Sequence, residues 1–138
     1  MMQKQLQQKM MEYQLMEERL KQIDQQRDFF IEKMVEIEQT KQAVEELEKN
    51  KEEDVLVPLG SGLFLPGKIN KKEKMLIGIG SDIILEKDSE GINNILEQRK
   101  KILEDNLENI QNSMMQIAKE MQLLQKEIQK LLPELKAG

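Results

Sequence analysis

Apolar side chains recur at alternating steps of four and three residues through the last third of the chain, from Leu96 to Leu135. Eleven of the twelve positions on this stripe are apolar, and the exception is Lys100. The positions, called here the C-terminal seam, are Leu96, Lys100, Leu103, Leu107, Ile110, Met114, Ile117, Met121, Leu124, Ile128, Leu131 and Leu135. A heptad period held over this length is typical of a coiled coil rather than of a helix on a globular core.

The first 50 residues carry a weaker stripe in one heptad frame, with ten of fourteen positions apolar. This N-terminal seam comprises Met2, Leu6, Lys9, Tyr13, Met16, Leu20, Ile23, Arg27, Phe30, Met34, Ile37, Lys41, Val44 and Glu48. Neither residues 1–50 nor residues 92–132 contain Gly or Pro. The pattern predicts two helices of about 60–75 Å each, at ~1.5 Å per residue. Because an apolar stripe of this length needs a partner in water, we expect the two helices to fold back on each other, antiparallel.

Counting outward from the short insert places Tyr13 near Glu127, Leu6 near Glu134, and both chain ends at the same end of the helix pair. Asp88 or Ser89 is a suitable N-cap for the second helix. Lys41 and Lys100 come to about the same height on the two seams. We favour snorkelling of both ammonium groups to solvent, and the alternative is a hinge at that height.

Residues 55–87 hold most of the turn-forming residues, and their pattern changes to short apolar runs. The runs 55–59, 63–69, 75–79 and 83–86 are predicted to be strands, with turns at 60–62, 70–72 and 80–82. Because Pro66 cannot donate a backbone hydrogen bond, its strand is expected to lie at the edge of a sheet or to contain a bulge. The fold class is therefore mainly α: a long antiparallel α-hairpin coiled coil with two β-hairpins inserted between its helices.

Several of these strands are apolar on both faces, and isolated hairpins are marginal in water. The helix seams are already in use, so burial has to come from other chains. We expect an oligomer assembled through the hairpins. The residues expected to carry it are Val55, Val57, Leu59, Leu63, Phe64, Ile69, Leu76, Ile77, Ile79, Ile83, Ile84 and Leu85.

Composition narrows the possible chemistry. The 138 residues suffice for one domain, aromatics make up 3%, and there is no Cys or His. These absences argue against disulfides, structural zinc and thiol or imidazole catalysis. A net charge of -5 makes a general phosphate-binding surface unlikely to form, so no nucleic-acid partner is expected. With no apolar run near the ~20 residues that span a bilayer and no signal-like N-terminus, we expect no membrane partner and a cytoplasmic protein.

No candidate active site emerges. Glu17-Glu18 and Glu45-Glu46 are adjacent pairs, and adjacent helix residues do not face each other, so a solvated face is favoured. Gly78-x-Gly80 lacks the longer glycine pattern and the Lys-Ser/Thr of a phosphate loop. We expect no enzyme, and no catalytic, cofactor-binding or metal site.

Three stretches of the predicted hairpins are distinctive: V-P-L-G-S-G-L-F at 57–64, G-K-I at 67–69 and M-L-I-G-I-G-S-D-I-I-L-E at 75–86. On these stretches, and over essentially its whole length, the chain resembles the alpha class of prefoldin subunits. Two hairpins between the helices are the layout of that class, whereas the beta class has one. Pro66 departs from the family's pattern, so the local strand geometry is expected to differ there.

The resemblance implies one prefoldin-like domain over residues 1–138, with coil helices at 1–50 and 89–133 and assembly hairpins at 55–87. It implies two alpha-class and four beta-class subunits, whose hairpins form a β-barrel platform with six coiled-coil tentacles. It further implies an ATP-independent holdase that binds unfolded polypeptides between the tentacle tips and delivers them to a group II chaperonin, without a cofactor.

A client-binding tip needs adaptable apolar groups, and Met is suited to this because it is unbranched and polarizable. Five of the ten Met residues lie within the first 16 positions. The candidate tip residues are Met2, Leu6, Met10, Met11, Tyr13, Leu15, Leu123, Leu131, Leu132 and Leu135. The alternative is that these residues only widen the coil contact. We expect Phe29, Ile31 and Val35 to widen it, with lining of the client cavity as their alternative. A structural coiled-coil adaptor that joins folded partners is the competing function.

Overall fold

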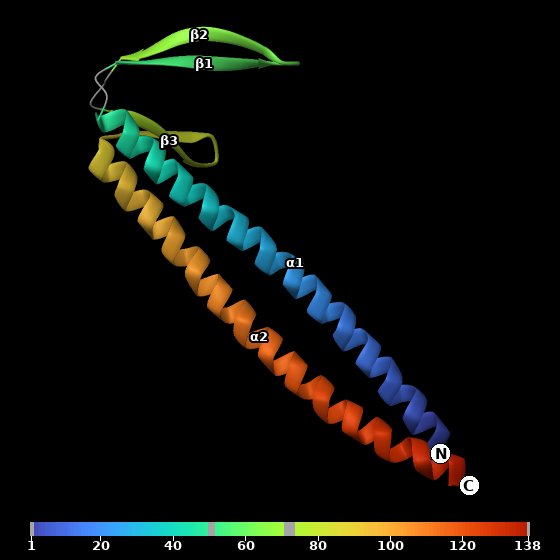
Figure 1. Ribbon diagram of the computed structural model, residues 1–138. Coiled ribbons are helices and arrows are strands. Elements are labelled where there is room, and N and C mark those ends of the chain that lie inside the picture. Colours follow the sequence, from blue (N-terminus) through green and yellow to red (C-terminus); the bar gives the residue numbers. More distant parts are fainter. Residues whose placement is uncertain (1, 50–51, 71–73, 138) are drawn as a thin grey trace. The chain divides into compact units, whose positions relative to one another are not determined.

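The computed structural model describes residues 2–49, 52–70 and 74–137 (Figure 1). Two long helices enclose two antiparallel β-hairpins in the sequence, which confirms the predicted fold class. The elements in chain order are α1 (Met2–Lys49), β1 (Glu52–Gly60), β2 (Leu63–Asn70), β3 (Met75–Gly80), β4 (Ile83–Lys87) and α2 (Ser89–Ala137).

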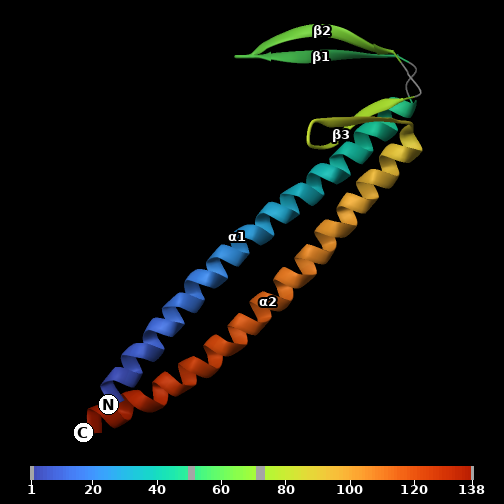
Figure 2. The same ribbon diagram turned by 180° about the vertical axis from the view of Figure 1, so that it is seen from behind.

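The chain divides into two units, each built from parts of both helices. The terminal unit combines Met1–Lys33 with Leu103–Gly138, and the hairpin unit spans Met34–Ile102. In the terminal unit, the first residues of α1 lie beside the last turns of α2, as Figures 1 and 2 show in blue and red. The Lys9 ammonium group forms an ion pair with Glu127 there. In the hairpin unit, Lys41 of α1 forms an ion pair with Glu97 of α2. The predicted antiparallel pairing therefore holds within each unit.

The core follows the two predicted seams. Eight hydrophobic side chains are buried among the described residues, four in each unit: Leu6, Ile110, Ile117 and Leu124, then Ile37, Val44, Ile92 and Leu96. Seven of these are seam positions, and Ile92 lies four residues before Leu96, outside the alternation of four and three. The other seam residues are half-buried except Met2 and Glu48, which are exposed, and Leu135, whose side chain lies outside the described residues. Burial of each of the eight buried side chains stabilises the folded chain by about 1.5–3 kcal/mol.

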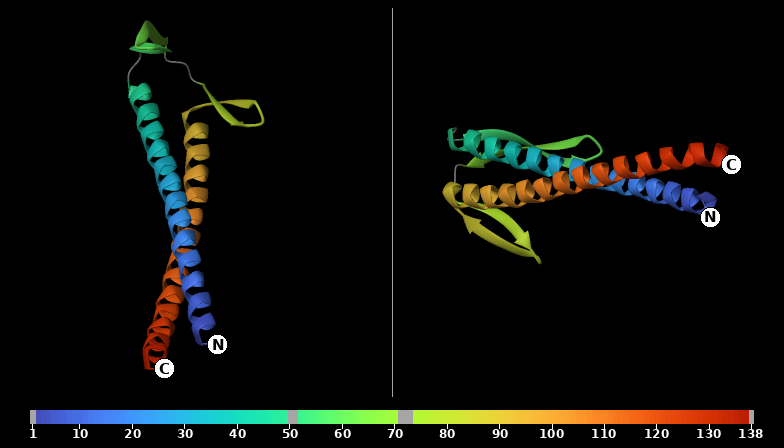
Figure 3. Two further views of the ribbon diagram at one scale, coloured as in Figure 1. Left: turned by 90° about the vertical axis from the view of Figure 1, so that its right-hand side faces the viewer. Right: turned by 90° about the horizontal axis from the view of Figure 1, so that it is seen from below.

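The hairpins form two separate two-stranded sheets (Figure 3). Their turns share one geometry. All four residues of the two loops have positive φ: 52° at Ser61 and 79° at Gly62, then 52° at Ser81 and 61° at Asp82. Two consecutive left-handed residues make the turn whose twist suits a two-residue hairpin. Each turn is preceded by a glycine, Gly60 or Gly80, at φ 110° or 105°, and by a shift in strand register.

Strand bounds agree with the sequence prediction, with β1 starting earlier, at Glu52. Pro66 lies within β2 opposite Leu56, in a two-stranded sheet, so it occupies an edge strand and the bulge falls at Pro58/Gly60 instead. Helix α2 was expected to end near Pro133 but continues to Ala137. Pro133 removes one backbone donor in the last turns, where the loss is small.

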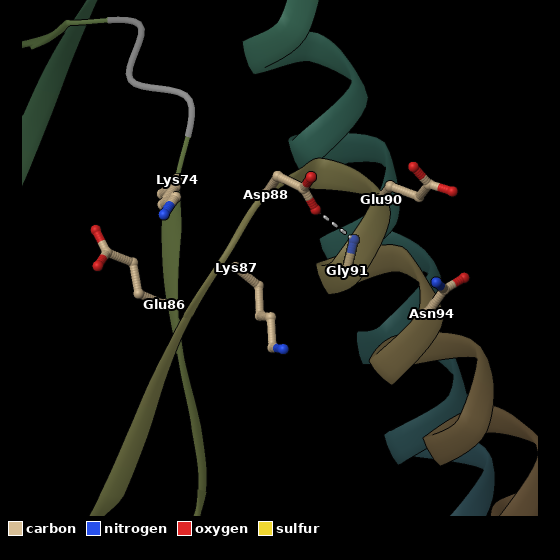
Figure 4. Close-up of a pocket in the computed structure, with 7 residues that line it drawn as sticks. All are labelled: Lys74, Glu86, Lys87, Asp88, Glu90, Gly91 and Asn94. Carbon is tan, nitrogen blue, oxygen red and sulfur yellow. Dashed lines mark hydrogen bonds between the residues drawn. The ribbon is translucent and has the colours of Figure 1, made fainter.

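The N-cap of α2 is Asp88, one of the two residues that the sequence offered. The Gly91 N–H donates to Asp88 Oδ1 at 2.8 Å (Figure 4). The Ile92 N–H donates to the Asp88 carbonyl at 2.9 Å. A side-chain oxygen that accepts from a first-turn amide is the standard capping interaction. Because β4 ends at Lys87 and α2 begins at Ser89, this single residue joins hairpin and helix.

Candidate binding surfaces

Both faces of the first hairpin are apolar and open. Cross-strand partners share a face, so Val57 and Leu65 lie on one side and Pro58 and Phe64 on the other. On the first side Val57 is 44% and Leu65 56% exposed, and on the second Phe64 is 52% exposed. An open groove of about 420 Å³ lies along Asp54, Val55, Leu56, Pro66, Gly67 and Lys68. The first hairpin therefore offers apolar surface in two directions.

The two faces of the second hairpin differ. Met75, Ile77 and Leu85 lie on one face, and all three are half-buried. Leu76 and Ile84 lie on the opposite face and are 72% and 63% exposed. The first face is the more protected one at these three positions, whereas Ile79 and Ile83, beside the turn, are 45% and 51% exposed.

The structure places every residue of the predicted assembly set on these hairpins, and none is buried. Val55, Ile77 and Leu85 are half-buried, and the other nine are exposed. Leu56 and Leu65 belong to the same surface and were left out of the predicted set, although both are more than half exposed. The sequence could have identified them, because these strands are apolar on both faces and residues of either face are candidates for the assembly surface.

The terminal unit carries a second set of exposed apolar side chains, all of them outside the seams except Met2. Met11 and Leu15 are 66% and 69% exposed and stand one helical turn apart on α1. Met2, Met10, Leu123 and Leu132 are exposed as well. These are six of the ten candidate tip residues.

The remaining candidate tip residues belong to the seam. Leu6 is buried, Tyr13 and Leu131 are half-buried, and the side chain of Leu135 lies outside the described residues. Leu6 could reach a client only if the two helices part. Tyr13 and Met10 meet in an apolar groove of about 300 Å³, lined by Met10, Tyr13, Gln14, Glu17, Gln125 and Ile128. This groove also bears out the predicted register, since Tyr13 lies near residues 125–128.

Three further residues of α1 were expected to broaden the coil contact, but the structure leaves them exposed. Phe29, Ile31 and Val35 are 55%, 44% and 51% exposed. Phe29 packs edge-on against Phe30, with ring centroids 5.8 Å apart, and lies 5.6 Å from the Lys33 ammonium group. Sequence reasoning missed Ile102 and Met115, which are 60% and 65% exposed on α2. Both fall outside the heptad frame, and that is the signal that could have identified them.

The three lysines on the seams, Lys9, Lys41 and Lys100, pair with carboxylates of the other helix. Besides the Lys41–Glu97 pair, the Lys100 ammonium group lies 2.8 Å from Glu38 Oε1. The pKa of Glu38 is lowered, because Lys100 hydrogen-bonds to its carboxylate and adds a positive charge, with a smaller contribution from Lys41. Both lysines are half-buried on the seam and send their ammonium groups to the other helix. The predicted snorkelling thus ends at carboxylates, and the hinge alternative stays a prediction.

Within the described ranges, no three acidic side chains gather as metal ligands would. The open groove in Figure 4, at the junction of β4 and α2, is lined by Lys74, Glu86, Lys87, Asp88, Glu90, Gly91 and Asn94. Its one hydrogen bond between drawn residues is the Asp88 cap. The exposed apolar surfaces of the hairpins and of the terminal unit are the candidate binding surfaces. Among the described residues, no helix is long and apolar enough to cross a membrane.

Comparison with known proteins decides the family. Residues 16–134 match the family described as "Prefoldin subunit". The chain belongs to the prefoldin family. Prefoldin subunit alpha of Nitrosopumilus maritimus is 34% identical over 101 residues, which cover 73% of this chain and 70% of that protein. The probable prefoldin subunit 5 of Dictyostelium discoideum is 36% identical over 64 residues, or 46% of this chain and 40% of that protein.

A solved prefoldin has the same fold. The filamentous PFD from Methanocaldococcus jannaschii, determined by cryo-electron microscopy, matches with a TM-score of 0.71 over 87% of this chain and 98% of that chain. At 18% identity this likeness concerns the fold. Prefoldin subunits are chaperone-type proteins that assemble into oligomeric complexes. Assembly of this kind explains why the hairpins of the single chain expose apolar surface.

Proposed function

We propose that the chain is the alpha-class subunit of an ATP-independent holdase. Two copies assemble with four beta-class subunits through their hairpins, in the cytoplasm. The complex holds unfolded polypeptides at the ends of its coiled coils and passes them to a group II chaperonin. The observation that carries this proposal is the separation of two exposed apolar sets, one on the hairpins and one in the terminal unit, on a chain whose seams are already filled.

The hairpin set supports assembly. Leu76 is 72% exposed and Leu56 64% exposed in the isolated chain, and apolar surface of this extent is characteristic of interaction sites. The two hairpins provide double-sided strands with free edges, which other subunits can cover by packing or by strand addition.

The terminal set supports client holding. Its exposed members include Met2, Met10 and Met11, whose flexible thioether side chains adapt to unrelated apolar partners. Each such group buried against a client contributes roughly 1–3 kcal/mol. Several weak contacts on several subunits then give reversible avidity. No nucleotide is required, because release needs only the loss of a few weak contacts.

The competing proposal is a structural adaptor that joins folded partners. Deletion of residues 1–14 and 129–138 distinguishes the two. The truncated chain is co-expressed with a beta-class subunit, and the complex is examined by native mass spectrometry and by suppression of client aggregation. Assembly that survives with suppression lost supports the holdase. Unchanged suppression refutes binding at the terminal unit.

A matched pair of substitutions tests assembly. Leu76→Asp places a charge on the exposed hairpin face and is expected to abolish the hexamer. Ile102→Asp places the same charge on α2 at a position of similar exposure, 60% against 72%, and is expected to leave the hexamer intact. If Leu76→Asp assembles like the unmodified chain, the hairpin face is not the assembly surface.

A further inference from the structure

The strand register of the first hairpin shows which backbone groups point outward. In an antiparallel pair, residues alternate between positions that exchange two hydrogen bonds with the partner and positions whose N–H and C=O point away. Pro58 pairs with Phe64 and Pro66 with Leu56. Because proline has no N–H, both pairs take the outward-pointing position. The two prolines lie two pairs apart in the ladder, as this alternation requires.

The second hairpin repeats this geometry. Its register shift falls between Gly78 and Gly80, as that of the first hairpin falls between Pro58 and Gly60. Gly78, opposite Ile84, therefore stands where Pro58 stands, and its carbonyl points away from β4. The Arg99 guanidinium donates to this carbonyl, with Nη2 and O 2.6 Å apart. Helix α2 thus caps the outer edge of β3 through one charge-assisted hydrogen bond.

Two anchors then hold the second hairpin along the start of α2. One is the chain itself at Asp88, fixed as the helix N-cap. The other is Arg99, eleven residues further on and therefore about 16 Å along the helix at ~1.5 Å per residue. From Asp88 back to Ile84, the partner of Gly78, the strand covers about 13 Å at ~3.3 Å per residue. The similar lengths fit a hairpin that runs along the first turns of the helix.

We propose that Arg99 is the positioning residue that orients the second hairpin for docking. It keeps Met75, Ile77 and Leu85 on the protected side and turns Leu76 and Ile84 toward an apolar hairpin face of a neighbouring prefoldin subunit. The proposal rests on the proposed assembly through hairpins, and the partner follows from family membership, since prefoldin subunits assemble with one another. Gly78 lies between these two side chains on that face, and a Cβ built there meets nothing within 4 Å.

Preorientation explains why the two hairpins differ. On the first hairpin, Val57 and Leu65 of one face and Leu56 and Phe64 of the other are all exposed. The second hairpin is already oriented, so docking onto it avoids part of the ordering cost that binding otherwise incurs. Docking of a neighbouring subunit onto the second hairpin is therefore expected to carry a lower ordering cost than docking onto the first.

The test uses Arg99→Met, which keeps much of the aliphatic stem and removes the donor. Lys101→Met removes the same charge from an exposed position of the same helix and serves as control. Hydrogen exchange of the isolated full-length chain is measured over 75–87 and over 52–70. Assembly rates are measured with a beta-class subunit. Arg99→Met is expected to speed exchange over 75–87 about tenfold and to slow assembly about tenfold, with helicity unchanged, because the charge-assisted hydrogen bond to the Gly78 carbonyl is lost.

Arg99→Lys is expected to recover most of both losses, because its ammonium group can still donate to the Gly78 carbonyl, and Lys101→Met is expected to behave like the unmodified chain. Unchanged exchange over 75–87 in Arg99→Met overturns the proposal, as does a slowing of equal size in Lys101→Met. Failure of the unmodified chain to assemble refutes the proposed function instead. The exchange measurement on the isolated chain still decides whether Arg99 orders the hairpin.

Discussion

Replacing Met11 and Leu15 by Gln tests the client surface most directly. The two side chains stand one turn apart on α1 and are 66% and 69% exposed. Gln has a helix propensity close to that of Met and Leu, so α1 is expected to persist. The change removes apolar surface without adding charge.

The size of the effect follows from the exposed fractions. Full burial of a Met or Leu side chain is worth about 1.5–3 kcal/mol, and about two-thirds of that surface is still available to a client. Each residue can therefore contribute about 1–2 kcal/mol, and the pair about 2–4 kcal/mol. Because clients also contact other apolar groups, we expect a loss of at least about tenfold, which corresponds to ~1.4 kcal/mol.

The assay is light scattering of a chemically denatured client diluted into buffer with the assembled complex. The measured quantity is the complex concentration that halves aggregation, which is expected to rise at least about tenfold. Met115→Gln is the matched control, because Met115 is 65% exposed in the same unit but lies far along the helix from the chain ends. Unchanged suppression by the double variant, or an equal loss in Met115→Gln, would refute client binding at Met11 and Leu15.

Three further predictions concern the fold. Ile117→Ala removes a seam side chain that is 8% exposed and should lower the free energy of unfolding by about 2–4 kcal/mol in urea titrations; a loss below that range would mean that the seam relaxes around the cavity. Asp82→Gly relieves a φ of 61° and should slow amide exchange over 75–87 by about two- to fivefold, whereas faster exchange would contradict the assigned turn. Lys100→Met should raise the pKa of Glu38 toward its ordinary value of 4.5 in NMR titrations. Because the Glu38 pKa is lowered in the folded chain, the ion pair with Lys100 stabilises the fold at any pH above the ordinary pKa of Glu38. This stabilisation is lost as the pH falls through the lowered pKa. A Glu38 pKa that the substitution leaves unchanged would show that the contact does not form in solution.

The heptad frame accounts for most of what the sequence predicted correctly. It identified seven of the eight buried side chains because burial in a long helix pair depends on one repeating geometry. Ile92 was missed because it lies outside this frame: the step of three before Leu96 falls on Asn93. The turns were equally predictable, since two consecutive left-handed residues need the Gly-Ser-Gly or Gly-Ser-Asp chemistry that the chain has.

The ion pairs and the Arg99 contact could not be predicted in the same way. Each depends on the register between segments far apart in sequence, and an error of one residue turns a side chain by ~100° around a helix. The sequence placed Lys41 and Lys100 at one height and favoured solvent as the destination of their ammonium groups. The structure pairs them with Glu97 and Glu38 instead. The link from Arg99 to Gly78 also requires the direction of a strand carbonyl, which only the hairpin register determines.

The positions that hold the fold and those proposed to bind partners occupy different parts of the heptad frame. Leu6 and Leu124 are 9% and 6% exposed on the seams, whereas Leu15 and Leu123 are 69% and 58% exposed outside them. The same residue type thus serves stability or binding according to its place in the repeat. Because buried and exposed sites share few neighbours, their free energies should be close to additive, so changes at Leu15 can alter client binding while the free energy of unfolding stays within about 0.5 kcal/mol. An equal loss of stability at Leu15 and Leu124 would show that α1 is covered on its outer face too, and that the exposed set is core rather than binding surface.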